Sequence, residues 1–167
     1  MKNLLKITTA IILLLSLQTA GFSQSDTSFK KTYKHNIGFG AGFTTGYGLA
    51  YRYMPERFGI QGIIGGKKDS YESEFNAGVT FLYDLNDTRF TTFYIYQSNS
   101  YKYNFTKNDG YYSTGSTETN TINNGLGFGL ELRVSKHLCA NAMVGYGSLE
   151  SGKEIQPVGE VCFFYKL

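Results

Sequence analysis

The residues best suited to chemistry are few in this 167-residue sequence. It contains two histidines, His35 and His137, and two cysteines, Cys139 and Cys162. The cysteines lack the C-x-x-C spacing of a zinc site and two scattered histidines do not complete one, so we expect no metal and no cofactor. Both cysteines are expected on the last two strands, with side chains on the same face. A cross-strand disulfide is one alternative, and two separately buried free thiols are the expected state.

Two glycine repeats have the spacing of phosphate-binding loops. They are Gly38-x-Gly40-x-Gly42 and Gly125-x-Gly127-x-Gly129. Such loops need the N-terminus of a helix directly after them, whereas more alternating residues follow both repeats. The interior of an eight-stranded barrel is only just wide enough for its side chains, so we interpret the glycines as inward positions that relieve crowding. Nucleotide binding is not expected.

The elements that position these residues are predicted to be β-strands, because apolar and polar residues alternate along most of the chain. In the clearest segment, 116–134, Leu126, Phe128 and Leu130 share one face and glycines occupy the other. A content of 20 Gly, 14 Tyr and 13 Phe also favours pleated sheets over helices. The predicted strands cover residues 34–42, 46–54, 58–66, 71–84, 89–104, 116–134, 138–147 and 156–167.

The connections between these strands are of two alternating kinds. Short turns on one side and longer loops on the other are typical of an outer-membrane barrel with both termini in the periplasm. The tight turns are 55–57, 86–88 and 135–137, and the longer connections are 43–45, 67–70, 105–115 and 148–155.

The N-terminus has the layout of a cleavable secretory signal peptide. Lys2 and Lys6 precede an apolar core that is too short to span a membrane, and small residues follow it. We assign 1–23 to the signal peptide and 24–33 to a periplasmic lead. Without Lys2 and Lys6, the 16 Lys and Arg residues fall to 14 against 13 Asp and Glu. This near-neutral balance argues against nucleic acid as a partner.

The last nine residues, 159–167, form an apolar, aromatic-rich strand that runs to the end of the chain. This ending resembles the insertion signal of outer-membrane barrels. With the eight alternating segments, residues 34–167 resemble the small OmpA/OmpX-type barrels of diderm bacteria. The resemblance implies an all-β, eight-stranded antiparallel up-and-down transmembrane β-barrel in the outer membrane. It also implies contact with membrane lipid and with the barrel-assembly machinery through the last strand.

The resemblance implies a structural or surface-interaction role without catalysis, and two alternatives were weighed against it. His137-x-Cys139, with Glu150 or Glu154, is similar to the His-x-Ser and glutamate set of lipid A deacylases, but cysteine replaces serine and His137 falls in a periplasmic turn. A lipid-modifying enzyme is therefore the first alternative. A soluble, lipocalin-like periplasmic barrel is the second, and it would place apolar residues inside instead of outside.

Four charged residues are expected inside the barrel, close to its periplasmic end. Counting along the strands from the tight turns and the C-terminus places Arg52, Glu131, Arg133 and Glu160 at inward positions. Charges in so narrow an interior are costly unless they are paired and hydrogen-bonded. We therefore predict a polar network in the lumen that closes the barrel to ions.

The third long connection is the candidate recognition surface. It combines aromatic residues with Asn, Ser, Thr and Gly, and it is long enough for the flanking strands to extend beyond the bilayer as a polar hairpin. This composition suits contact with an extracellular protein or glycan, although tyrosines also anchor barrels at the membrane interface. The candidate residues are Tyr101, Tyr103, Phe105, Tyr111 and Tyr112.

Overall fold

A computed structural model describes residues 33–69, 71–110 and 113–167. The predicted signal peptide, 1–23, and almost all of the predicted lead, 24–33, lie outside the described residues. Tyr111 and Tyr112 of the candidate recognition surface also lie outside them.

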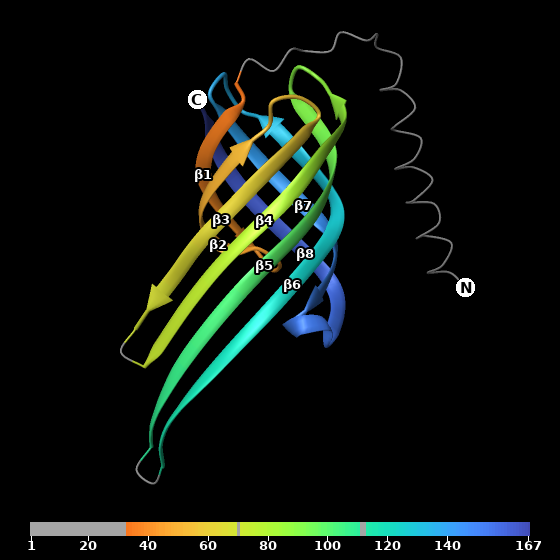
Figure 1. Ribbon diagram of the computed structural model, residues 1–167. Coiled ribbons are helices and arrows are strands. Elements are labelled where there is room, and N and C mark those ends of the chain that lie inside the picture. Colours follow the sequence, from red (N-terminus) through yellow and green to blue (C-terminus); the bar gives the residue numbers. More distant parts are fainter. Residues whose placement is uncertain (1–32, 70, 111–112) are drawn as a thin grey trace, which may run out of the picture.

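Eight strands pair in sequence order into one closed antiparallel barrel, in which β8 also pairs with β1 (Figure 1). The predicted fold class is confirmed. Successive side chains of a strand point to opposite faces of the sheet. The alternating Tyr, Phe, Leu and Ile residues therefore give each strand one apolar face, which turns outward in the closed barrel. The strands are β1 His35–Gly42, β2 Gly46–Tyr53, β3 Phe58–Lys68, β4 Glu72–Asp87, β5 Thr91–Gly110, β6 Ser113–Arg133, β7 Leu138–Leu149 and β8 Glu154–Lys166, with a 3-10 turn, η1, at Glu150–Gly152.

The two ends of the barrel differ in shape. At one end, here called the turn end, β1 begins, β8 finishes and short connections join β2 to β3, β4 to β5 and β6 to β7 (Figure 1). At the other end, here called the hairpin end, β5 and β6 continue far beyond β1 and β2. The difference is large, because β5 and β6 have 20 and 21 residues and β1 and β2 have 8 each.

The connections at the hairpin end depart from the prediction in two places. Most of 105–115 belongs to strands, because β5 and β6 remain paired as far as Gly110 opposite Ser113. The segment 43–45 is a three-residue turn that folds into the barrel, not a longer outer connection. Thr44 and Thr45 are buried there, and the Ser100 hydroxyl donates to the Thr44 carbonyl. The small polar threonines fit beside Gly78 and Gly125, whose missing side chains leave room for them.

The outward faces are apolar, as the alternation predicts. Phe39, Leu126 and Phe163 expose about two thirds of their surface. Leu126, Phe128 and Leu130, which the alternation placed together on one face of β6, all lie outside. In β5, whose facing the alternation left open, Phe93 and Ile95 point outward and Tyr94 and Tyr96 are buried.

The barrel interior contains two small apolar clusters. Tyr94 fits inside because it packs against Gly129, where a Cβ atom would lie 2.3 Å from its ring. The Tyr94 hydroxyl donates to Asn141, so its polar end is satisfied. The clusters are Ala50, Ile63, Cys139, Cys162 and Phe164, and Met54, Leu82, Tyr94, Tyr96 and Met143.

Candidate functional sites: a lumen network and an aromatic hairpin face

Arg52 is the centre of the polar interior. It is 1% exposed, and its Nη1 lies 2.7 Å from Oε2 of Glu131 on the far side of the barrel. Its Nε and Nη2 donate to Oε1 of Gln61, over 3.0 and 2.7 Å, from the neighbouring strand. The guanidinium also lies over the Phe164 ring, 4.3 Å from its centroid. A buried charge is tolerated only with such a set of partners.

Glu131 and Glu160 are the two carboxylates connected to this arginine, Glu131 directly and Glu160 through Gln61. Glu131 accepts from Arg52 and, through Oε1, from Lys166 Nζ at 2.9 Å. Glu160 has neutral partners: Thr45, Gln61 and the Cys162 thiol donate to it, with Gln61 Nε2 at 2.7 Å from Oε1. We call Arg52, Gln61, Glu131, Glu160 and Lys166 the lumen network.

Arg133 is placed differently from the other three predicted charges. Its Nε lies 3.9 Å from Oε1 of Glu131, and its main partner is Asp87, with further hydrogen bonds to Thr88 and Thr92. Its side chain is 18% exposed, so it sits at the rim of the turn end. The structure thus brings Arg52 and Glu131 into direct contact, connects Glu160 to them through Gln61 and keeps Arg133 at the edge.

Two members of the lumen network, Gln61 and Lys166, and the neighbouring Thr45 were not among the predicted site residues. Gln61 has inward parity, but parity alone does not show that it lies between Arg52 and Glu160. Thr45 comes from a turn that the alternation placed outside the lumen. Lys166 has the expected inward parity, and its pairing with Glu131 joins β8 to β6 across the lumen.

The other sequence candidates for chemistry do not assemble into a site. Cys139 and Cys162 are buried free thiols, and Asn141, not Cys139, lies opposite Cys162. His137 precedes β7 at the turn end, whereas Glu150 and Glu154 lie beyond the last residue of β7 at the hairpin end. Among the residues that the structure describes, no group of three His, Cys, Asp or Glu could hold a metal ion.

Aromatic side chains line the outer face of the protruding hairpin. Tyr101 is 42% exposed and donates a hydrogen bond of 2.7 Å to Asn120 Oδ1 on β6. Tyr103 and Phe105 take the next outward positions on β5, and Phe75 lies opposite Tyr103 on β4. We call Phe75, Tyr101, Tyr103 and Phe105 the hairpin face. Phe75 was not among the predicted recognition residues, because it lies in a different segment of the sequence and only the strand register places it beside Tyr103.

Three amides separate the hairpin face from the apolar band of β5 and β6. Gln97 and Asn99 point outward and exchange hydrogen bonds of 2.9 and 3.1 Å. Asn124 lies opposite Asn99 on β6. We call Gln97, Asn99 and Asn124 the amide layer. The apolar outward residues from Leu126 to Val134 on its turn-end side match the length that a strand needs to cross a bilayer.

The inner face of the same hairpin is polar. Ser100, Lys102 and Asn104 alternate with the aromatic residues along β5. Lys102 Nζ lies 2.9 Å from Oε1 of Glu74 on β4, in a partly exposed ion pair. The two faces of the hairpin therefore offer different chemistry, aromatic outside and charged or hydroxylic inside.

No model of a known protein family matches the chain, and no curated protein is significantly similar to it. Solved structures do resemble it. The N-terminal β-barrel domain of Pseudomonas aeruginosa OprF has a TM-score of 0.53 and 12% identity over 80% of this chain and 95% of that one. The Yersinia pestis attachment invasion locus protein Ail has 0.46 and 15%, over 79% and 94%. Neisserial surface protein A has 0.44 and 14%, over 80% and 93%.

The similarity to the OprF barrel concerns the fold alone. At this level, the chain has the eight-stranded architecture of the OmpA/OmpX-type outer-membrane barrels. Within the described ranges, no helix is long and apolar enough to span a bilayer.

Proposed function

We propose that the protein is an integral outer-membrane barrel that takes part in surface interactions and catalyses no reaction. The distribution of polar and apolar side chains supports membrane insertion, because it is the reverse of that in a soluble protein. Large apolar side chains cover the outside of the barrel, and buried polar and charged side chains, including the Arg52–Glu131 ion pair, lie inside. Such a continuous apolar exterior would aggregate in water, whereas lipid solvates it. The same distribution argues against the lipocalin-like alternative.

The proposed orientation places the turn end, with both termini, in the periplasm. Short turns on the periplasmic side and long extensions on the outer side are the usual asymmetry of outer-membrane barrels. The hairpin face then lies outside the cell. The last strand, which resembles an insertion signal, is the segment that the barrel-assembly machinery would recognise.

The hairpin face is the proposed recognition surface. A girdle that only anchors the barrel would continue directly from the apolar band. Phe75 on β4 does so, but on β5 the amide layer comes between the band and Tyr101. Phe105 lies six residues beyond Asn99, about 20 Å along the strand at ~3.4 Å per residue. The headgroup region on each side of a bilayer is only about 5–7 Å thick, so the outer part of this face is beyond lipid anchoring. Tyr101 is exposed, and Tyr103 and Phe105 are half-buried at outward positions. Aromatic side chains accessible in this way among amides suit contact with an extracellular protein or glycan.

A two-sided substitution of the hairpin tests this proposal. In the test variant, Tyr101, Tyr103 and Phe105 are each replaced by Ser. In the control variant, Lys102 and Asn104 on the inner face of the same strand are replaced by Ser. Bacteria producing each protein are incubated with immobilised extracellular glycoproteins and polysaccharides, and membrane levels and the heat-dependent gel shift are recorded in parallel.

We expect normal assembly of both variants and a tenfold or greater loss of binding by the outer-face variant alone. The recognition assignment is wrong if the outer-face variant binds as well as wild type. It is also wrong if cells producing the wild-type protein bind no more than cells without it. Recovery of the folded protein from the soluble periplasm would instead contradict membrane insertion.

A further inference from the structure

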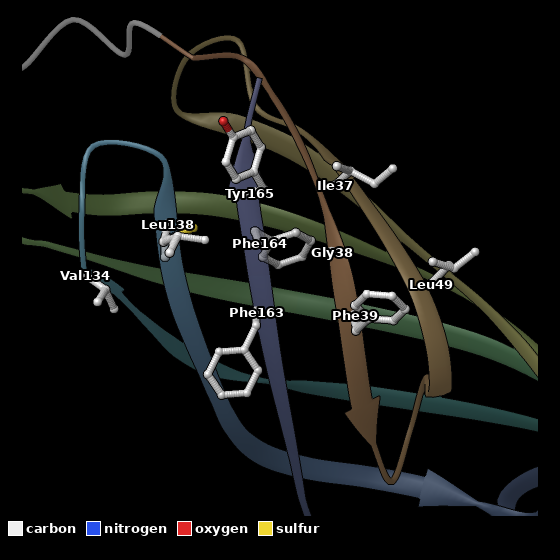
Figure 2. Close-up of a pocket in the computed structure, with 10 residues that line it drawn as sticks. Ile37, Gly38, Phe39, Leu49, Val134, Leu138, Phe163, Phe164 and Tyr165 are labelled. Carbon is white, nitrogen blue, oxygen red and sulfur yellow. The ribbon is translucent and has the colours of Figure 1, made fainter.

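A groove of about 580 Å³ lies on the outer wall where β8 closes against β1 (Figure 2). Outward residues of four strands line it, including Phe39, Leu138 and Phe163. Three inward positions, Gly38, Cys139 and Phe164, also contribute to the lining, so the groove reaches the strand layer itself. We call this the seam groove. Its lining is almost entirely apolar, and its volume is within the range of small-molecule sites.

The seam groove depends on a close approach of two strands. A Cβ atom at Gly38 would lie 1.8 Å from the Phe163 carbonyl oxygen, so only glycine lets β1 pack against β8 at this point. With the two strands this close, outward side chains on both of them, Ile37 and Phe39 on β1 and Phe163 and Tyr165 on β8, form walls of the groove (Figure 2).

Polar aromatic groups surround the seam groove at the turn end. Tyr165 belongs to the lining, and its ring stacks on His137 at 5.5 Å between centroids. The hydroxyl of Tyr165 points along the wall toward the turn end (Figure 2). The Tyr33 ring also contacts His137, at 5.2 Å between centroids, and His137 Nδ1 lies 3.3 Å from the Lys166 carbonyl oxygen. A hydrogen bond there leaves Nε2 of His137 free for a ligand.

Two lysines, Lys136 and Lys166, lie next to the groups that contact His137. Lys136, directly before His137, is exposed. Lys166 points inward to Glu131, so its charge is already paired. The backbone N–H of Leu167 donates to the His35 carbonyl, so the residues after β8 lie beside the start of β1. The rim thus offers hydroxyl, imidazole and ammonium groups directly beside an apolar groove.

We propose that the seam groove binds one phospholipid, with an acyl chain against Phe39, Phe163 and Leu138. Its phosphate is held at the rim by Tyr165, His137 and Lys136. The inference rests on the proposed membrane location, because only then does the groove face lipid. The turn end would face the periplasmic leaflet, so the ligand is a glycerophospholipid of that leaflet. The acyl chain is already surrounded by hydrocarbon in the bilayer, so binding at this position depends on van der Waals packing in the groove and on the headgroup contacts.

The test compares lipid retained by matched variants. Leu138→Trp fills the seam groove. Ile95→Trp adds the same side chain to β5, a strand distant from the seam in barrel order, at another outward position. Each mature protein is extracted in mild detergent, its fold is checked by the heat-dependent gel shift, and bound phospholipid is counted by native mass spectrometry. The proteins are then stripped of lipid and titrated with phosphatidylglycerol.

We expect about one phospholipid per barrel for wild type and Ile95→Trp, and at least tenfold weaker rebinding for Leu138→Trp. His137→Gln combined with Lys136→Gln should also weaken rebinding about tenfold, without filling the groove. Equal retention by all folded variants would indicate a non-specific lipid annulus and overturn the proposal. A folded, membrane-inserted wild type with no bound phospholipid would also overturn it, and the proposed function would stand. A wild type that does not enter membranes would reject both.

Discussion

Gln61 faces Glu160 inside the lumen, and its Nε2 donates a hydrogen bond of 2.7 Å to Oε1 of that carboxylate. The oxygen of the same amide accepts two hydrogen bonds from Arg52. A side-chain amide has one accepting and one donating end, so these partners fix the orientation of Gln61. Through it, a carboxylate with only neutral partners is connected to the Arg52 ion pair.

Removal of the central arginine should be costly. Arg52→Ala leaves Glu131 with one fewer cation and removes two donors from Gln61, so we expect a loss of roughly 3–5 kcal/mol for a fully buried pair. Arg133→Ala is the matched control at the rim, where a partly exposed ion pair contributes about 0–1 kcal/mol. Urea unfolding of the purified barrels in detergent measures both. Equal destabilisation by the two variants would contradict the central role of Arg52.

The lumen network should also keep the barrel closed to ions. The interior of an eight-stranded barrel is filled by side chains, and here hydrogen-bonded groups from β2, β3, β6 and β8 cross it. Single-channel recordings of the reconstituted wild type should show no steady conductance, with a known wide porin as the positive control. A stable open pore would show that the network does not close the lumen.

One glycine should be essential for closure of the barrel. Gly38→Ala places a Cβ atom 1.8 Å from the Phe163 carbonyl oxygen, a contact that requires β1 and β8 to separate. Gly62→Ala is the control, because its Cβ atom would meet nothing nearer than 3.9 Å. We expect folded Gly38→Ala protein to fall well below wild type and Gly62→Ala to remain near it. The gel shift and membrane yield report the difference.

The depth of outward residues can be tested on one strand. Phe128→Arg introduces a charge near the middle of the apolar band and should cost about 2–4 kcal/mol, whereas near the interface the cost is about 0–1 kcal/mol. Val134→Arg, directly after β6 at the turn end, is the interfacial control. Folding yields into lipid vesicles should therefore fall more for Phe128→Arg. The reverse order would mean that the membrane lies elsewhere on the barrel.

The alternation along the chain predicted the fold because side-chain direction in a strand depends only on parity. That rule placed Leu126 and Phe128 outside and Arg52 and Glu131 inside. It could not predict which inward residues meet, since contacts across the lumen depend on the stagger of the strands. Glu160 was therefore expected among the charges, but its link through Gln61 was not.

Turns and long connections were harder to predict than strands. The segment 105–115 contains Asn, Asp, Gly and Ser, which favour loops, yet cross-strand pairing between β5 and β6 continues through most of it. Parity assigned outward directions to Tyr101 and Phe105 only once their strand was known to extend so far. The inward fold of Thr44 and Thr45 has no local signal, because it depends on space beside distant glycines.

The inward turn at Thr44 and Thr45 has a consequence for the order of assembly. This turn belongs to the first hairpin of the barrel, yet Thr45 bonds to Glu160 and the backbone N–H of Phe43 bonds to the Gly159 carbonyl, both in the last strand. Glu160 therefore gains its Thr45 partner only when the two ends of the sheet meet. In a barrel whose first and last strands have not yet paired, this carboxylate lacks that hydrogen bond. The bond therefore stabilises the pairing of β1 with β8 and opposes their separation.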